Sequence, residues 1–283
     1  MFEEFKNKVL FVTGAASGMG RAVAIRFGSL GCKVAVAARK PDRAAETVRM
    51  VEEAGGEALF VPCDVGDEES VRAAIEQTVA TFGSLDFAFN NAGCGADGVN
   101  IPFAPLTEVT EGDWLKVIQT NLTGMFHCLK YELIQMQKQG GGAIVNTSSI
   151  GGLHMAPGFG AYGPSKAGVI AITQTAATEN AKANIRVNVI CPGPTDGTNL
   201  MADSVGAGAQ DTEFLVNNII PMGKLGTTKD IADSVVFLMS DMAGHITGAV
   251  MPVCGGRQMG GSRNGSSHFR TYVPGHTGKG AEC

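Results

Sequence analysis

The chain has 283 residues, of which 44% are apolar and 17% charged, and its formal net charge is −5. This composition is typical of a folded globular protein and excludes a disordered chain, and the length is enough to bury a large core. The acidic balance argues against a polyanionic partner such as nucleic acid. The elements along the chain must therefore supply the evidence for a function.

The N-terminal residues and the cysteines favour a cytoplasmic protein. The first eight residues include acidic side chains and no apolar run, so we expect no signal peptide. No stretch approaches the roughly 18 uninterrupted apolar residues that a membrane span needs, so we expect no membrane association. The seven cysteines are scattered and form no Cys-x-x-Cys pair, which favours reduced thiols and argues against structural zinc.

The first predicted unit is a strand, a glycine-rich turn and a helix. Residues 8–13 form an apolar run, residues 14–20 contain Gly14, Gly18 and Gly20, and residues 21–30 have helical periodicity. Such a turn presents free backbone N–H groups and a helix N-terminus to a pyrophosphate. The alternative is a tight strand-to-helix turn that uses its glycines only for their backbone freedom.

The second predicted strand, residues 33–38, is followed by two cations. In a dinucleotide-binding unit the adenosine ribose lies at the end of this strand, where an acidic side chain would bind a free 2′-hydroxyl. This chain has Ala38 there, followed by Arg39 and Lys40, which suit the 2′-phosphate of NADP(H). NADP(H) is therefore favoured over NAD(H). The alternative is that both cations are solvated loop charges.

Strand and helix patterns alternate along the rest of the chain. Further strands are predicted at residues 57–63, 85–89, 143–149, 184–190 and 249–253. This alternation predicts an α/β fold over residues 1–256, with a single doubly wound, Rossmann-type parallel sheet of about seven strands and helices on both faces. Ligands bind at the carboxyl ends of such strands, which places Gly14, Arg39, Asp64 and Asn91 along one edge.

Four local features carry further expectations. Residues 195–222 are polar and weakly periodic, so we interpret them as a mobile flap, and the glycine-rich, basic residues 257–283 as an extension outside the core. Thr228 is predicted to cap the last helix. Asn121 is predicted to lie near the middle of a helix spanning about 111–138, where a buried amide needs hydrogen-bond partners.

Tyr162 and Lys166 are one helical turn apart in the sequence Tyr-Gly-Pro-Ser-Lys. An ammonium near a phenol favours the phenolate, so this spacing predicts a lowered pKa for Tyr162. Such a tyrosine can exchange protons near neutral pH. The spacing alone is weak evidence, because surface helices produce it by chance.

Taken together, the motifs resemble those of the short-chain dehydrogenase/reductase family. The resemblance covers about residues 6–256, and each motif alone is weak, but the complete set in the family's order is specific. The motifs are Thr13-Gly-Ala-Ala-Ser-Gly-Met-Gly20, Cys63-Asp-Val65, Asn90-Asn-Ala-Gly93, Asn121, Ser148-Ser149, Tyr162-Gly-Pro-Ser-Lys166 and Cys191-Pro-Gly193.

The resemblance implies a catalytic tetrad of Asn121, Ser149, Tyr162 and Lys166. Ser149 is preferred to Ser148 because it lies 13 residues before Tyr162, close to the family's spacing. Tyr162 would exchange a proton with the substrate oxygen and Ser149 would stabilise that oxygen. Lys166 would bind the nicotinamide ribose, and Asn121 would hold a relay water. The nicotinamide would supply or accept the hydride, and no metal is required.

The resemblance also implies the residues that bind the cofactor. They are Gly14, Ser17, Gly18 and Met19 for the pyrophosphate and adenosine, Arg39 and Lys40 for the 2′-phosphate, Asp64 and Val65 for the adenine, Asn91, Ala92 and Gly93 for the ribose path, Tyr162 and Lys166, and Pro192, Gly193 and Thr195 for the nicotinamide. Three positions depart from the family pattern. Gly197, beside Thr198, stands where a threonine is common, Cys254 replaces an aspartate, and Ser17 stands where some NADP-preferring members have a basic residue.

The substrate pocket is predicted to be mostly apolar, with walls from Gly95, Gly151, His154, Met155 and Phe159 and from the flap. We therefore expect a carbonyl reductase or alcohol dehydrogenase that uses NADP(H) and acts on a neutral ketone or secondary alcohol. One alternative is an NAD-dependent dehydrogenase of the same family. Another is a non-catalytic dinucleotide sensor, which the complete tetrad disfavours. The resemblance further implies a homotetramer or dimer.

Overall fold

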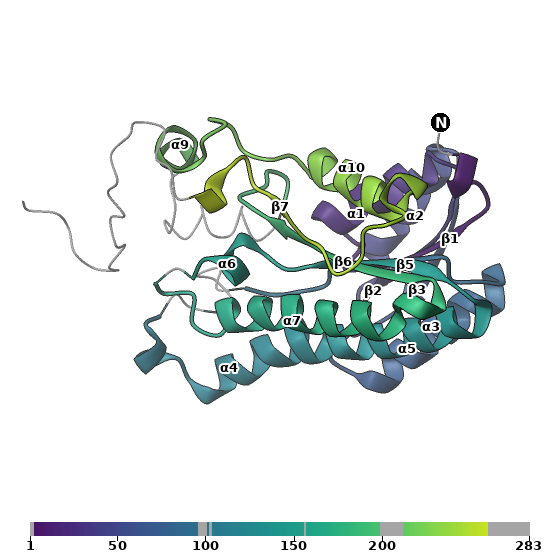
Figure 1. Cartoon of the computed structure of the whole chain (residues 1–283), viewed down its shortest axis with the longest axis horizontal. Coiled ribbons are helices and arrows are strands. Elements are labelled where there is room, and N and C mark those ends of the chain that lie inside the picture. The colour runs from purple at the N-terminus through teal and green to yellow at the C-terminus, as the bar shows by residue number, and fades with distance from the viewer. Residues whose placement is uncertain (1–2, 96–100, 102–103, 156, 199–211, 260–283) are drawn as a thin grey trace, which may run out of the picture.

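The computed structural model describes residues 3–95, 101, 104–155, 157–198 and 212–259. These residues form one seven-stranded sheet between two layers of helices (Figure 1). The strands are β1 (Val9–Thr13), β2 (Lys33–Ala38), β3 (Glu57–Pro62), β4 (Phe87–Asn90), β5 (Gly142–Thr147), β6 (Ile185–Pro192) and β7 (Val250–Val253). All neighbouring strands are parallel, in the order β3-β2-β1-β4-β5-β6-β7, which confirms the predicted fold class.

The order of the strands reverses between β1 and β4. From β1 the chain moves outward to β3 and then returns to the centre, where β4 pairs with the free side of β1. Because the strands are parallel, their carboxyl ends share one edge of the sheet. The connections leave β1 and β4 in opposite directions, so a crevice opens outside these two ends, where ligands bind in folds of this kind.

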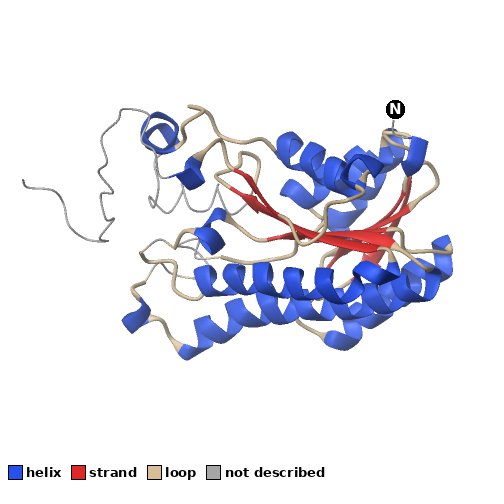
Figure 2. Ribbon diagram, in the orientation of Figure 1, coloured by secondary structure: helices blue, strands red, loops and turns tan. Residues whose placement is uncertain are grey.

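Helices cover both faces of the sheet (Figure 2). On one face lie α1 (Gly18–Gly28), α2 (Pro41–Glu53) and α10 (Thr228–Met239), and on the other α3 (Glu68–Phe82), α5 (Gly124–Gln139) and α7 (Tyr162–Asn180). The shorter helices α4 (Glu111–Ile118), α6 (Ile150–Leu153) and α9 (Thr212–Phe214) lie toward the end of the molecule where α7 begins. None of the helices within the described ranges is long and apolar enough to cross a membrane.

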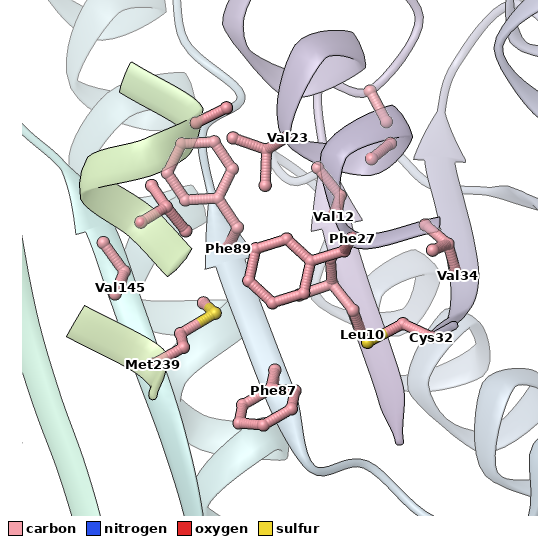
Figure 3. Packing of buried hydrophobic residues seen from close by; sticks show 14 of the residues in the cluster. Leu10, Val12, Val23, Phe27, Cys32, Val34, Phe87, Phe89, Val145 and Met239 are labelled. Atoms are coloured by element: carbon pink, nitrogen blue, oxygen red, sulfur yellow. The ribbon is translucent and has the colours of Figure 1, made fainter. Parts of the chain in front are cut away.

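The core under α1, α2 and α10 is built almost entirely of apolar side chains (Figure 3). Phe5, Phe27 and Phe87 form a ring cluster with centroids 5.2 to 6.0 Å apart. Phe5 and Phe27 are completely buried. Burying one such side chain stabilises a fold by about 1.5–3 kcal/mol, so this cluster holds α1 and the N-terminal turn on the sheet.

The long helix predicted over about 111–138 is interrupted. α4 ends at Ile118, α5 begins at Gly124, and Gln119–Thr123 form a π-helical turn between them. Asn121 lies in this turn rather than in regular α-helix. Single π turns inside helices are rare and frequently occur at functional sites.

The predicted cap of the last helix is wrong by one residue. The Thr227 hydroxyl accepts a hydrogen bond from the Asp230 N–H at 3.1 Å, and the Asp230 carboxylate accepts one from the Thr227 N–H at 2.8 Å. This reciprocal pair is a capping box, which needs an acidic or amide side chain three residues after the cap. Thr228 has Ile231 at that position and cannot form one.

The predicted flap and extension lie partly outside the described residues. Residues 199–211 of the flap are not described, and the part that follows is helical, with α9 and a π-helical turn at Leu215–Ile219. The predicted extension begins with a 3₁₀ turn, Arg257–Met259, that packs against α6. Residues 260–283 lie outside the described part of the chain.

Candidate active site

At the crevice beside β1 and β4, the hydroxyl of Thr13, the last residue of β1, connects the end of β1 to the segment that follows β4. This oxygen accepts hydrogen bonds from the backbone N–H groups of Asn91 at 2.9 Å and Ala92 at 3.1 Å. The segment after β4 is therefore fixed against the glycine-rich turn after β1. Gly14 allows this approach, because a Cβ there would lie 3.0 Å from the Cα of Ala92.

The glycine-rich turn has the backbone geometry of an anion cradle. Gly14 and Gly18 have φ of 65° and 53°, a region that favours glycine. A Cβ on Gly20 would lie 2.5 Å from the carbonyl oxygen of Gly14, so only glycine lets α1 start this close to the strand. The N–H groups of the first turn of α1 carry the positive end of the helix dipole. The turn therefore fits a pyrophosphate.

The other predicted nucleotide contacts follow the same edge. Ser17 is the residue that precedes α1, and Met19 lies in its first turn. Arg39 and Lys40 follow the buried end of β2 and are both exposed, and no ion pair found among the described residues uses them. This leaves both cations available for a phosphate.

Asp64 and Val65 form the turn after β3. The Asp64 carboxylate accepts a hydrogen bond from the Gly66 N–H at 3.0 Å, which shapes the turn. Val65 is buried, and its carbonyl oxygen lies 3.0 Å from Nδ1 of His127 on α5. The turn is thus held by the helix behind it, with the exposed Asp64 on its outer side.

Ser149, Tyr162 and Lys166 are brought together at the carboxyl end of β5. Ser149 precedes α6 and its hydroxyl accepts the Gly151 N–H at 3.0 Å. The neighbouring Ser148 hydroxyl donates to the carbonyl of Lys166 at 2.7 Å, so it holds α7 in place. The Ser148 hydroxyl is therefore engaged by the backbone, and the reactive role of Ser149 stays a prediction.

Lys166 is almost fully buried beside Tyr162. Its ammonium donates to the carbonyl oxygen of Thr147 at 3.0 Å and lies 5.9 Å from the centre of the Tyr162 ring. Burial lowers the pKa of Lys166 to about 8, because the charged form loses its hydration. The amine therefore becomes neutral at a lower pH than an exposed lysine does.

The predicted lowering of the Tyr162 pKa is wrong for the protein alone. Burial raises this pKa, and the hydrogen bond with Ser149, which favours the phenolate, offsets the increase only in part. The error has a physical cause. The spacing indicated a nearby ammonium, but it did not reveal that the phenol itself is withdrawn from water.

Asn121 is anchored within the π turn, close to Lys166. Its side-chain amide exchanges two hydrogen bonds with the backbone of Cys94, at 2.8 and 2.7 Å, and donates to the Ser165 hydroxyl at 3.0 Å. A Cβ on Gly93 would lie 3.1 Å from Oδ1 of Asn121 and 3.3 Å from Nζ of Lys166. Gly93 thus lets Asn121 and Lys166 come close together, while the relay water stays a prediction.

The segment after β6 closes the opposite side of the crevice. Pro192 ends β6, and a Cβ on Gly193 would lie 2.7 Å from Cβ of Cys254, so glycine is needed there. The buried Thr195 donates to the Gly193 carbonyl at 3.0 Å. A Cβ on Gly18 would lie 3.7 Å from Cα of Thr198, so the glycine-rich turn faces this segment.

Two of the predicted substrate walls, Gly151 and Phe159, lie beside Tyr162. A Cβ on Gly151 would lie 3.4 Å from Cε1 of Tyr162, and the ring of Phe159 lies 6.0 Å from the tyrosine ring. Met155 is exposed, and its sulfur lies against Gly163. Gly95 follows Cys94 and is buried, and His154 is exposed; no hydrogen bond within the described ranges joins either residue to Tyr162, so their place in the pocket stays a prediction.

Two groups that shape the site were missed in the sequence. The Thr13 hydroxyl could have been found, because it is a polar residue that ends an apolar strand. The Thr147 carbonyl that holds Lys166 belongs to the backbone, and no residue type signals it.

Comparisons with known proteins agree with this geometry. A family model described as "Enoyl-(Acyl carrier protein) reductase" matches residues 14–258. An uncharacterized oxidoreductase of Thermotoga maritima is 39% identical over 255 residues, covering 89% of this chain and 98% of the relative. A 3-oxoacyl-[acyl-carrier-protein] reductase FabG of Staphylococcus epidermidis is 38% identical over 256 residues, covering 89% of this chain and 100% of the relative.

Solved structures give the same result. The crystal structure of NAD⁺-bound xylitol dehydrogenase superimposes with a TM-score of 0.83 at 35% identity, covering 89% of this chain and 100% of that one. The extent of these matches and the arrangement of the site lead to one conclusion. The chain belongs to the short-chain dehydrogenase/reductase family of oxidoreductases.

Proposed function

We propose that this protein is an NADP(H)-dependent carbonyl reductase or alcohol dehydrogenase that acts on a neutral ketone or secondary alcohol. The observation that carries the proposal is the grouping of Ser149, Tyr162 and Lys166 at one strand end, with Ser149 hydrogen-bonded to the tyrosine. These groups can bind a carbonyl oxygen and exchange a proton with it.

In this mechanism the chain's own residues position the substrate and move the proton. When bound, the nicotinamide supplies or accepts the hydride. Tyr162 donates its phenolic proton to the carbonyl oxygen during reduction and takes it back during oxidation. In the protein alone, the hydrogen bond from Ser149 favours the phenolate of Tyr162. With substrate bound, the Ser149 hydroxyl donates instead to the substrate oxygen as negative charge develops there. Lys166 holds the ribose and places positive charge beside the phenol.

The glycine-rich turn and the segment after β6 would hold the dinucleotide. Gly14, Gly18 and the first turn of α1 would bind the pyrophosphate, and Gly193 and Thr195 would lie beside the nicotinamide. Asp64 and Val65 would flank the adenine, and Asn91, Ala92 and Gly93 would line the ribose path. This fit rests on the close contacts at Gly14 and Gly20, which leave no room for a side chain in the cradle.

The exposed cations Arg39 and Lys40 support NADP(H) as the preferred cofactor. The alternative is NAD(H), which is favoured by Ser17 and by the similarity to an NAD⁺-bound xylitol dehydrogenase. The ratio of kcat/KM for NADPH and NADH separates the two. We expect NADPH to be preferred, and equal or better use of NADH would remove the role of Arg39.

Exposed apolar side chains on the segments after β5 and β6 support a neutral substrate. Met155, Phe214 and Met222 are 56%, 48% and 64% exposed and lie on the segments that follow β5 and β6. An alcohol or ketone is also what the names of the relatives imply, since one acts on a 3-oxoacyl group and another on xylitol. A panel of neutral ketones and secondary alcohols would identify the class.

The substitution Tyr162→Phe tests the mechanism directly. Removing a general acid lowers a rate by roughly 10²–10⁴-fold, so we expect kcat to fall by that amount while the cofactor still binds. Tyr131→Phe is the matched control, because it removes a surface hydroxyl that bonds Glu68. Unchanged turnover in Tyr162→Phe, measured by NADPH absorbance, would contradict the mechanism.

Exposed apolar side chains support assembly into a dimer or tetramer. Leu115 on α4 and Phe126 and Ile134 on α5 are 56%, 46% and 40% exposed. Burial of these side chains against a second copy would remove apolar surface from water. Light scattering of the purified protein would measure the assembly, and a monomer would contradict it.

A further inference from the structure

Glu132 on α5 is completely buried, and no step of the proposed mechanism uses it. It lies on the core-facing stripe of the helix, four residues after Cys128 and four before Met136, which are both buried. Charged residues are rarely buried to this extent unless they are paired. Its surroundings therefore need an explanation.

The contacts of Glu132 form a chain across four elements. Asn90 at the end of β4 donates from Nδ2 to Oε2 of Glu132 at 2.8 Å and to Oδ1 of Asn146 at 3.0 Å. Asn146 on β5 donates to the hydroxyl of Thr173 on α7 at 2.9 Å. This polar chain connects α5, β4, β5 and α7 through the middle of one face.

Two oxygen atoms in this chain lack partners among the described residues. They are Oε1 of Glu132 and Oδ1 of Asn90, and both are buried. The other polar atom of each group, Oε2 of Glu132 and Nδ2 of Asn90, already takes part in the hydrogen bond of 2.8 Å between the two side chains. If Glu132 is ionised, both atoms are acceptors with no donor, which is costly in a buried site.

A single proton placed between these two oxygens would give each of them a partner. We infer that Glu132 is a neutral carboxylic acid that donates from Oε1 to Oδ1 of Asn90 and accepts from Nδ2 through Oε2. The side chains then form a closed pair with two parallel hydrogen bonds. The pair is a positioning device at the ends of the strands that carry the site, and Glu132 is its acidic member.

The electrostatic surroundings favour the neutral form. The titratable groups that face Glu132 are two thiols, Cys63 after β3 and Cys128 on α5, and burial raises the pKa of both. The neighbours on β4, β5 and α7 are Asn90, Asn146 and Thr173, which do not titrate. Within the described structure no lysine, arginine or histidine stabilises the carboxylate, and burial raises the pKa of Glu132 to about 8.

The pair lies directly behind the proposed site. Asn90 precedes the segment Asn91–Gly93, and Asn146 precedes Thr147, whose carbonyl holds Lys166. Thr173 lies two turns after Lys166 on α7. Displacing Asn90 or Asn146 would shift two strand ends and one catalytic helix relative to one another. Only this effect on activity rests on the proposed function, and the protonation of Glu132 does not.

Infrared difference spectroscopy of the full chain tests the protonation itself. At pH 7 the wild type should show the carbonyl stretch of a protonated carboxylic acid that resists exchange with bulk solvent. Glu132→Gln is the matched variant, because its amide can form the same two hydrogen bonds without titrating. The band should be absent from Glu132→Gln, and a wild-type spectrum without the band would overturn the inference.

The pH dependence of stability gives a second test. The unfolded glutamate loses its proton above about 4.5 and the folded one only near 8, so wild-type stability falls with rising pH in this interval. The unfolding constant of the wild type, divided by that of Glu132→Gln, should rise by up to about tenfold per pH unit and become constant above 8. A ratio that does not change with pH would contradict a neutral, buried Glu132.

Activity separates positioning from simple core filling. Glu132→Gln should keep the kcat of the wild type at pH 7, and its activity should decline less above pH 8. Glu132→Leu fills the space but removes both hydrogen bonds, and its kcat should fall several-fold while it stays folded. Equal kcat in Glu132→Leu and Glu132→Gln would overturn the positioning role. Absence of turnover in the wild type would refute the proposed function and leave the infrared and stability results unaffected.

Discussion

The two faces of the sheet are packed in different ways. Under α1, α2 and α10 the core is formed mainly by aromatic and aliphatic side chains, including Phe27 and Phe89 (Figure 3), and its buried polar side chains include Thr47, which donates to the Ala15 carbonyl. Under α3, α5 and α7 the apolar core also contains Asn90, Asn146 and Glu132, and α7 carries Tyr162 and Lys166. Buried polar groups are costly unless they are hydrogen-bonded. The comparison suggests that one face mainly supplies stability and the other places chemical groups.

The largest expected effect tests the face under α1, α2 and α10, which we call the apolar face. Phe27→Ala removes a completely buried ring that contacts Phe5 and Phe87, and such changes destabilise proteins by about 3–5 kcal/mol. The ring lies far from the strand ends that carry the site, so kcat per folded molecule should not change. Urea unfolding measures the loss of stability, and an activity assay corrected for the folded fraction measures kcat per folded molecule.

Phe126→Ala is the control for this experiment, because Phe126 is partly exposed on α5. Its effect on the unfolding free energy of the isolated chain should be much smaller. If Phe27→Ala lowered kcat as strongly as it lowers stability, the two faces would not have separate roles.

The next effect tests the face under α3, α5 and α7, which we call the polar face, by a substitution of Lys166. Burial lowers the pKa of this lysine from 10.5 to about 8, so the folded protein carries its charge at a cost. Each pKa unit corresponds to about 1.4 kcal/mol, so Lys166→Met should stabilise the protein at pH 7 by an amount on the order of 3 kcal/mol. The same change should nearly abolish turnover, because the proposed ribose contact and the positive charge beside Tyr162 would be lost.

The sign of the pH dependence makes this prediction specific. Between pH 8 and 10.5 the folded lysine has lost its proton while the unfolded one retains it, so wild-type stability rises with pH. The stability advantage of Lys166→Met should therefore shrink over that interval. An advantage that stays constant across it would mean that the ammonium is not destabilised by burial.

The strands were easier to predict from the sequence than the contacts of the polar face. Runs such as residues 8–13 and 33–38 are apolar without interruption, so the strands and their parallel arrangement follow from pattern alone. The motif residues that follow strands also lie at one edge of the sheet as predicted, because the carboxyl ends of parallel strands share that edge. Asn121 was expected in a regular helix because a π turn has no residue signature in a single sequence.

The polar face depends on three-dimensional facts that spacing does not contain. The sequence indicated that Lys166 is near Tyr162, but burial of the phenol raises the pKa of Tyr162. Glu132 was overlooked because a single glutamate in a helix is usually solvated. Its spacing from Cys128 and Met136 was the available signal, and only the sheet's register shows that Asn90 faces it.

The smallest expected effect tests whether the two faces are linked at the site. Thr227 caps α10 on the apolar face. The preceding residue, Gly226, donates to the Pro194 carbonyl and accepts from the Asp196 N–H, so it is bonded to the segment 194–196 that borders the crevice. Thr227→Ala should cost about 1 kcal/mol of stability, while Thr228→Ala, which leaves the capping box intact, should cost much less. If the faces act independently, the KM for the cofactor stays the same in both variants. A higher KM in Thr227→Ala alone would mean that the end of α10 positions the segment around Thr195, and the apolar face would then share in binding.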